Sequence, residues 1–392
     1  MAIVLNSIEE SLIQLKEEII SNRRYLHQHP ELSFEEQETS KFIETKLREY
    51  GISKIEHYGK YGLIGRIKGA TAGPTVAIRA DFDALPIQDQ KNVSYKSKVD
   101  GKMHACGHDG HTAALLGVAK VLKQFEDQLK GEVILLFQPA EEKPPGGAQF
   151  MIEDGVLNDV DVIFGAHLDT GSPIGTVSVG SGYQMAAVDY FKIDIKGAGG
   201  HGAYPHQTVD SIVIGTTLVN SLQQIVSRKV NPQQSAVVTV GKFHAGNAFN
   251  VIPESVVIEG TVRTFEEDVQ NLVEKEIQSI STGIAQAFGA TANVTYERGY
   301  PSLYNHVEET NVVKEAFIEV FGEQVLPMHS TMGAEDFAFY LKHKPGSYFR
   351  VGARNENPST QFPHHHPAFD FDEEALINIG RSFLAILNKY VF

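Results

Sequence analysis

The sequence predicts an α/β protein in which a mostly parallel sheet carries an inserted α+β unit of the ferredoxin-like type. Two observations lead to this prediction. Strands and helices alternate in the first half of the chain, and the order β-α-β-β-α-β then occurs once between residues 188 and 297. Because the alternation of strands and helices returns after residue 297, we expect a discontinuous larger domain, residues 1–183 and 298–392, with residues 184–297 inserted into it.

The first half of the chain contains the alternating elements. Apolar residues at helical spacing between positions 8 and 19, with Ser7 and Glu10 as a capping box, predict a first helix that stops before Pro30. A second helix opens at Ser33 with Glu36 and closes at Gly51. The elements that follow are strands at 62–68, 74–81, 132–137 and 160–165, and helices at 111–125 and 147–153. The apolar run 132–137 is typical of a strand covered on both faces of its sheet.

The predicted inserted unit begins near Tyr183. Its expected elements are strands at 188–196, 236–244, 254–265 and 291–297, and helices at 208–226 and 267–288. A helix at 311–321, a strand at 348–353 and a C-terminal helix from residue 372 then restore the α/β pattern. The order of the inserted elements is that of a split βαβ fold.

Composition excludes several classes of protein. The 392 residues are 42% hydrophobic, enough for a sizeable core, and the net charge is −15. A chain this acidic has no general basic surface for nucleic acid or an anionic membrane. The single cysteine excludes an intrachain disulfide, and no apolar run approaches the ~20 residues that span a bilayer. With no basic leader at the N-terminus, we expect a cytoplasmic location.

The densest group of candidate metal ligands is the segment 104–111, which holds three histidines and the only cysteine. A thiol and imidazoles suit Zn, Mn, Co or Ni. The alternative is a polar helix N-terminus with a capping aspartate and a buried free thiol. Cys106 and His108 are two residues apart in a glycine-containing loop that can turn both inward, which favours a metal site.

Three further polar groups come at the ends of predicted buried strands. They are Asp81 with Asp83, the adjacent pair Glu141 and Glu142, and His167. Parallel strands place their carboxyl ends at one edge of a sheet, where such sheets bind ligands. Each group alone is explained by an ordinary polar strand end, but their shared edge favours a site. One of two adjacent carboxylates can bind a metal ion while the other acts as a general base.

Two late segments add candidates. His364, His365 and His366 are consecutive and cannot all point the same way, so one of them is a candidate ligand; the alternative is a surface run. Glu335 and Asp336 form another acid pair, for which a helix N-terminus stabilised by its dipole is the alternative.

Several strings in this sequence, taken together, resemble the M20 metallopeptidase/amidohydrolase family along nearly the whole chain. The match is to the amidohydrolase branch, which includes hippurate hydrolases, N-acetyl-diaminopimelate deacetylases and plant auxin-conjugate hydrolases. The matching strings are RADFDALP (79–86), CGHDGH (106–111), QPAEE (138–142), GGHGA (199–203), HQHPELS (27–33), NVIP (250–253), GTVR (260–263) and MGAED (332–336). The resemblance implies a metallo-exopeptidase-like catalytic domain and identifies the inserted unit as a lid and dimerisation domain, hence a homodimer.

The resemblance also implies roles for particular residues. Two divalent metal ions (Zn, Mn, Co or Ni) would be held by one late histidine, which the branch pattern favours as His365, together with Cys106, His108, Glu142 and His167. Glu141 would be the general base, and Asp81 would orient the site. His201 would bind the substrate or the developing oxyanion, with Asn250 and Arg263 as substrate-binding neighbours. The wider family has histidine where this chain has Arg79, which cannot be a ligand.

We therefore expect hydrolysis of the amide bond of an N-acyl amino acid, of N-acetyl or N-benzoyl type, to a carboxylate and a free amino acid. The expected partner is that small molecule or a short peptide, with no nucleic acid and no membrane. One alternative is a dipeptidase or carboxypeptidase with the same two-metal centre. Another is a non-catalytic metal- or ligand-binding protein, which would leave Glu141 without a use.

Overall fold

The computed structural model describes residues 2–392, which form two compact units. The larger unit contains the described residues up to Gln184, together with Tyr304–His329 and Asp336–Phe392. The smaller unit contains Met185–Leu303 and Ser330–Glu335. The division of labour between a catalytic domain, 1–183 and 298–392, and a lid and dimerisation domain, 184–297, stays a prediction.

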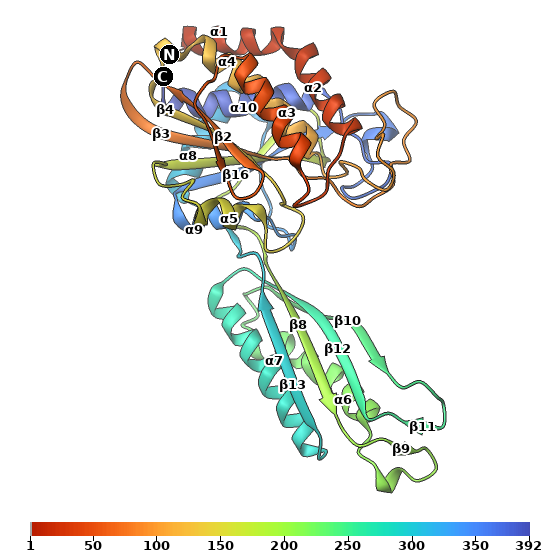
Figure 1. The fold of residues 1–392 in the computed structure, drawn as a ribbon. Helices are drawn as coiled ribbons and strands as arrows, with labels where there is room; N and C mark the ends of the chain where they lie inside the picture. Colours follow the sequence, from red (N-terminus) through yellow and green to blue (C-terminus); the bar gives the residue numbers. More distant parts are fainter. Residues whose placement is uncertain (1) are drawn as a thin grey trace. The chain divides into compact units, whose positions relative to one another are not determined.

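The larger unit is built on an eight-stranded sheet (Figure 1). Its strands, in spatial order, are β1 (Ile55–Tyr58), β2 (Gly62–Lys68), β4 (Lys130–Gln138), β3 (Thr71–Asp81), β5 (Val162–Pro173), β16 (Gly346–Arg354), β6 (Val177–Val179) and β15 (Val325–Pro327). The four central strands run parallel, whereas β1 with β2, β2 with β4, and β6 with β16 are antiparallel. The prediction of a mostly parallel α/β sheet is confirmed.

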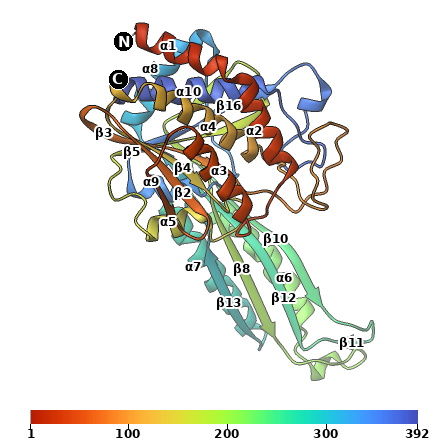
Figure 2. The same cartoon turned by 45° about the horizontal axis from the view of Figure 1, so that its top comes forward.

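Helices cover both faces of this sheet (Figures 1 and 2). They are α1 (Ala2–Gln14), α2 (Lys16–Gln28), α3 (Gln37–Glu49), α4 (His108–Gln124), α5 (Gly147–Glu153), α8 (Val307–Phe321), α9 (Phe337–His343) and α10 (Glu374–Tyr390). Helices α4 and α10 pack on one face, with α1 and α2 outside them, and α5 and α9 lie on the other. Gly117 of α4 permits this stacking, because a Cβ there would lie 2.5 Å from Ile19 of α2.

Two helices were predicted to begin at capping boxes, Ser7 with Glu10 and Ser33 with Glu36, and both predictions are wrong. Ser7 lies inside α1, and the helix predicted as continuous is interrupted at Leu15. Helix α3 begins only at Gln37, and its preceding residue makes no side-chain cap. Ser33 and Glu36 instead hydrogen-bond to groups more than 45 residues away in sequence. A local signature was outcompeted here by tertiary hydrogen bonds.

Two further boundaries affect the candidate site. Helix α4 begins at His108 rather than His111, because Gly107 adopts a φ of 95° and reverses the chain just before it. Strand β5 continues to Pro173 rather than ending at residue 165, so His167 lies within the strand and not after it. Both differences lengthen the regular structure that carries candidate ligands.

The smaller unit has a four-stranded antiparallel sheet in the order β10 (Ala236–Ala245), β12 (Ser255–Thr264), β8 (Ala187–Lys196) and β13 (Thr291–Arg298). Helices α6 (Ser211–Gln224) and α7 (Glu267–Ala287) contact each other and the sheet, closing a core around Phe191 and Leu218. This strand order is that of a split βαβ unit, so the ferredoxin-like prediction is confirmed.

The remaining short strands are β7 (Gly182–Met185), β14 (Leu303–Asn305), β9 (Gly200–His201) and β11 (Val251–Ile252), of which the last two pair with each other. These strands, like β1, β6, β15 and α9, were not predicted, because segments of two to seven residues carry too little periodicity. None of the helices from α1 to α10 combines the length and the apolar character that crossing a bilayer requires.

Candidate metal centre

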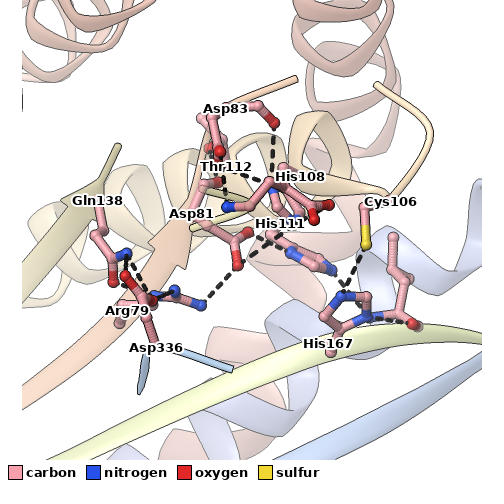
Figure 3. Close-up of polar contacts among 12 residues, drawn as sticks. Arg79, Asp81, Asp83, Cys106, His108, His111, Thr112, Gln138, His167 and Asp336 are labelled. Carbon is pink, nitrogen blue, oxygen red and sulfur yellow. Dashed lines mark hydrogen bonds and ion pairs between the residues drawn. The ribbon is translucent and has the colours of Figure 1, made fainter. Parts of the chain in front are cut away.

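Side chains from three strands and from the start of α4 converge at one edge of the larger sheet (Figure 3). The Sγ atom of Cys106 lies 3.4 Å from Nε2 of His167. Nε2 of His108 lies 3.8 Å from Oδ2 of Asp81 and 3.9 Å from Oε1 of Glu142. The structure therefore brings together the polar groups that the sequence placed at the ends of separate strands.

All five predicted metal ligands belong to this cluster. Three sets of donor atoms each lie within 4.8 Å of one another: Cys106 with His108 and His167; Cys106 with Glu142 and His365; and His108 with Glu141 and Glu142. A thiol, three imidazoles and carboxylates are the donors expected for Zn, Mn, Co or Ni. Overlapping sets that share Cys106 and His108 fit two neighbouring ions better than one.

His108 offers a free ring nitrogen to such an ion. Its Nδ1 lies 3.0 Å from the backbone oxygen of Asp83 and 3.1 Å from Oδ1 of the same residue, so Nδ1 carries the hydrogen. Its Nε2 is buried and has no hydrogen-bond partner among the described residues. A buried polar atom without a partner is costly, and a metal ion would satisfy it.

The electrostatics of the cluster also suit cations. Burial alone would lower the pKa of His108, but Asp81 and Asp83 raise it to about 10. Burial, together with Glu142 and Glu141, raises the pKa of the Cys106 thiol well above its usual range. Burial and the ring of His111 lower the pKa of His167, which keeps that imidazole neutral. The site therefore holds protons that a metal ion would displace on binding.

Asp83 connects three parts of the cluster. Its carboxylate accepts hydrogen bonds from the His108 ring, from the Ser33 hydroxyl at 2.7 Å and from the Glu142 backbone N–H at 3.0 Å. Although burial opposes its charge, these donors lower its pKa. A carboxylate that fixes the ring of a ligating histidine is the usual support of a metal site.

His111 has a supporting position, in contrast to His108. Its Nδ1 lies 2.6 Å from Oδ1 of Asp81, and its Nε2 accepts a hydrogen bond from the Leu168 N–H at 2.9 Å. Both ring nitrogens are therefore occupied, which leaves no lone pair for a metal ion. His104, the third histidine of the segment, is buried beside His27, with a ring separation of 6.3 Å, and belongs to none of the donor sets.

Arg79 explains how the chain departs from the wider family pattern. Its guanidinium is fully buried and lies 2.6 Å from Oδ2 of Asp81, 2.9 Å from Oδ1 of Asp336 and 2.8 Å from Oε1 of Gln138 (Figure 3). Although burial opposes the charged form, His108 and Arg79 hold the pKa of Asp81 well below its usual range. Arg79 thus orients the carboxylate that holds His111, which agrees with the prediction that it is no ligand. Asp336 precedes α9 but makes no side-chain cap there.

A second buried network fixes the other side of the first turn of α4. Asp109 accepts hydrogen bonds from Arg23 at 3.0 Å and from the His27 ring at 2.7 Å, and Lys91 lies 2.9 Å from the second His27 nitrogen. Burial opposes the charge of Asp109, but Arg23 and His27 lower its pKa below its ordinary range. Sequence reasoning missed Arg23 and Lys91, because their partners are distant in the chain and no local spacing reveals them.

The three late histidines point in different directions. Nε2 of His365 lies 3.2 Å from Oε1 of Glu142, while the His366 ring stacks on Phe362 at 4.4 Å. The ring of His364 lies 5.1 Å from that of His167 but joins none of the donor sets. This geometry favours His365 as the late ligand.

The remaining predicted site residues lie in the smaller unit. His201 is on β9, and its Nδ1 accepts a hydrogen bond from the Ala203 N–H at 3.0 Å. Asn250 precedes β11 and accepts the Gly202 N–H at 2.9 Å through its backbone oxygen. Arg263 is half-buried on β12 and donates to the backbone oxygen of Val262 at 3.0 Å. Their roles toward a substrate stay predictions.

Comparisons with known proteins agree with this centre. Residues 77–389 match the model of Peptidase family M20/M25/M40. The chain is 46% identical to an N-acetyl-L-cysteine deacetylase of Bacillus subtilis over 95% of its length and 89% of that protein. It is 46% identical to an N-acyl-L-amino acid amidohydrolase of Geobacillus stearothermophilus over 77% of its length and 81% of that protein.

A solved structure also resembles this chain. The crystal structure of a dinuclear metal binding peptidase from the M20 family, from Bacillus subtilis, is 40% identical to this chain and superimposes with a TM-score of 0.84. The superposition covers 95% of this chain and 98% of that one. The converging strand ends, the donor sets and these similarities lead to one conclusion: the chain belongs to peptidase family M20/M25/M40, whose amidohydrolases act on C–N amide bonds.

Proposed function

We propose that this protein is a metal-dependent amidohydrolase that cleaves N-acyl amino acids to a carboxylate and a free amino acid. The observation that carries the proposal is a buried donor cluster, with Nε2 of His108 unsatisfied, directly beside a carboxylate that can act as a base. The names of the deacetylase and amidohydrolase relatives support acylated amino acids as the substrate class.

Cys106, His108, Glu142, His167 and His365 are proposed to hold two divalent metal ions, Zn, Mn, Co or Ni. Such ions supply an activated water molecule, since bound zinc lowers the pKa of water to about 7. The chain's own groups provide the rest of the chemistry. Glu141 is 7% exposed, and its carboxylate lies within 4.8 Å of donor atoms of His108 and Glu142. Glu141 would accept the proton of the attacking water and later deliver it to the leaving amine.

His201 is proposed to stabilise the oxyanion that develops on the scissile carbonyl. Because Nδ1 of His201 accepts the Ala203 N–H, the hydrogen of the neutral ring lies on Nε2, where it can be donated. The ring is on an exposed strand of the smaller unit, available to a ligand. Asn250 and Arg263 are proposed as its neighbours in substrate binding. Removing one such donor typically costs about 10²–10³ in rate.

The smaller unit is also the proposed surface of homodimerisation. Helix α6 exposes Val213, which is 50% accessible, and Phe249 is fully exposed after β10. Exposed large apolar side chains on one small domain favour burial against a partner. A cytoplasmic location and a reducing compartment, which keeps Cys106 a free ligand, complete the proposal.

Replacement of the base tests the proposed function. Glu141→Ala should lower hydrolysis of N-acetyl and N-benzoyl amino acids by at least about 10²-fold, because proton transfer is lost, while both metal ions are retained. Activity is measured on a panel that also contains dipeptides, with metal content determined by mass spectrometry. Glu323→Ala, which removes an exposed carboxylate of the larger unit, is the matched control.

The same panel decides between the alternatives. Preferential cleavage of dipeptides would assign a peptidase with this two-metal centre, and metal binding without hydrolysis of either class would assign a non-catalytic binding protein. Wild-type activity in Glu141→Ala would refute the role of the base. Absence of bound metal, and of stimulation by added metal, would refute the whole proposal.

A further inference from the structure

Three residues other than glycine have a left-handed backbone in the described part of the chain. They are Phe34, Ala140 and His365, with φ angles of 70°, 54° and 66°. Residues with a Cβ rarely adopt this conformation, and they persist there only when the surroundings enforce it. His365 is itself a proposed metal ligand, and Ala140 directly precedes Glu141 and Glu142. Strained backbone therefore coincides with the turn that carries the base.

Two hydrogen bonds hold Ala140 in this conformation, one at its N–H and one at its carbonyl oxygen. Its N–H donates to Oε1 of Glu36 at 2.8 Å, and its carbonyl oxygen accepts the Gly147 N–H, at the start of α5, at 3.0 Å. The Glu36 bond reaches across 104 residues of sequence. Without it, nothing in the local sequence favours a left-handed alanine at this position.

Glu36 is a fully buried carboxyl group that belongs to none of the metal-donor sets. The same short segment contains Ser33, whose hydroxyl donates to Asp83, and Asp83 in turn accepts the Glu142 N–H. The segment 33–36 therefore contacts the turn directly at Ala140 and is linked to it at Glu142 through Asp83, so that the two connections lie on either side of Glu141. Burial and the charge of Asp83 raise the pKa of Glu36 to about 8, so its neutral form, which still accepts a hydrogen bond through Oε1, is favoured at neutral pH.

We propose that Glu36 is a positioning residue for the reaction: its carboxyl group fixes the left-handed turn at Ala140 and thereby aims Glu141 toward the attacking water and Glu142 toward the metal ions. The inference rests on the proposed function for the role of Glu141. The part that concerns Glu142 can be measured without turnover. Glu36 acts through the backbone and touches no reacting group.

A cavity beside Glu36 supplies an independent test. Glu36 lines a cavity of about 390 Å³ together with Phe34, Tyr61, Pro139 and Phe150. Its second oxygen, Oε2, makes no hydrogen bond with any described residue. When the side chain is truncated, a small carboxylic acid can therefore enter and replace the missing acceptor of the Ala140 N–H.

The experiment compares Glu36→Gln, Glu36→Ala, Ala140→Gly and the double variant Glu36→Ala/Ala140→Gly. Glu36→Gln keeps the acceptor and the shape, so its kcat should stay within about threefold of the wild type. Glu36→Ala should lower kcat about 10–100-fold at nearly constant KM, the range found when a supporting group of a metal site is lost. Glycine adopts positive φ without strain, so the double variant should recover at least about fivefold.

Two further measurements separate positioning from folding and from the proposed function. Co²⁺ titrated into the metal-free protein, followed by its thiolate absorption at Cys106, should bind about 10-fold more weakly to Glu36→Ala and recover in the double variant. Acetate at constant ionic strength should restore activity to Glu36→Ala but not to the wild type, with chloride as the control. If Glu36→Ala does not fold, Glu36→Asp, which retracts the carboxyl group by one methylene, takes its place.

The outcomes are distinguishable. If the wild type hydrolyses no substrate on the panel, the proposed function fails, and the Co²⁺ titration alone decides the inference. Glu36→Ala with unchanged kcat and unchanged Co²⁺ affinity would overturn the inference. Equal losses of kcat in Glu36→Gln and Glu36→Ala would also overturn the inference. So would a failure of both glycine at position 140 and acetate to restore the activity of Glu36→Ala. Either result would show that the hydrogen-bond acceptor at position 36 does not act through the turn at Ala140.

Discussion

In the larger unit, His108 and its neighbour His111 are held by the buried carboxylates of Asp83 and Asp81, whereas in the smaller unit His201 lies on an exposed strand of two residues. Asp81 and Asp83 are each fixed by several donors at 2.6–3.1 Å, and both are at most 1% exposed. The His201 ring accepts a single backbone hydrogen bond. In the proposed mechanism, this difference separates two requirements of hydrolysis: a rigid centre that makes the nucleophile, and an adaptable group that meets the substrate.

The difference also predicts how each region responds to mutation. Substitutions in the buried network should change stability and metal loading together with activity. Substitutions at the exposed residues should change activity alone. Substitution of Arg79 in the larger unit and of His201 in the smaller unit tests this contrast.

Removal of Arg79 should have the largest effect. Arg79→Leu takes away the cation that compensates Asp81 and Asp336 in a fully buried environment. Loss of one partner of a buried ion pair typically costs about 3–5 kcal/mol of unfolding free energy. Urea unfolding of the metal-free protein measures this loss, and hydrolysis should fall in parallel because His111 loses its support.

Arg79→Lys is the matched control for this substitution. It keeps the charge but loses the planar fork that reaches Asp81, Asp336 and Gln138 at once, so its loss of stability should be smaller but measurable. A stable, fully active Arg79→Leu protein would show that the buried network is not what holds the centre.

Removal of the His201 ring should lower activity without changing stability. His201→Ala is expected to reduce kcat about 10²–10³-fold through loss of an oxyanion donor, with metal content and thermal midpoint unchanged. His206→Ala, which removes another exposed ring from the same loop, is the control and should retain activity. A drop in metal content or stability in His201→Ala would contradict the contrast between the two units.

The sequence predicts the strands and their ends better than it predicts the residues that support the candidate centre. Strand ends such as Asp81 and Glu141 could be found because parallel strands place their carboxyl ends together, and one short apolar run marks each strand. The residues that hold these side chains could not be found. Arg23 contacts Asp109 across 86 residues and Glu36 contacts Ala140 across 104, and only the packed structure brings such partners together.

Glu36 shows why local signals mislead at such places. Ser33 followed by Glu36 reads as a capping box, yet Glu36 accepts the Ala140 N–H and Ser33 donates to Asp83, which accepts the Glu142 N–H. Both side chains find partners that are distant in sequence, so neither caps the helix that follows. A local rule that fails beside an active site is therefore a guide to residues that support the chemistry.

The smallest expected effect concerns the pH dependence of stability. The pKa of Glu36 is about 8 in the folded protein against an ordinary value of 4.5, so the folded state holds its proton more tightly than the unfolded state. The stabilisation from this proton is complete below pH 4.5 and is lost as pH rises through about 8. Between about pH 7 and pH 9 the wild type should lose about 1 kcal/mol relative to Glu36→Gln, which cannot titrate. Urea unfolding of both metal-free proteins across this range measures the difference, and parallel curves would show that Glu36 is already ionised at neutral pH and holds Ala140 as a carboxylate.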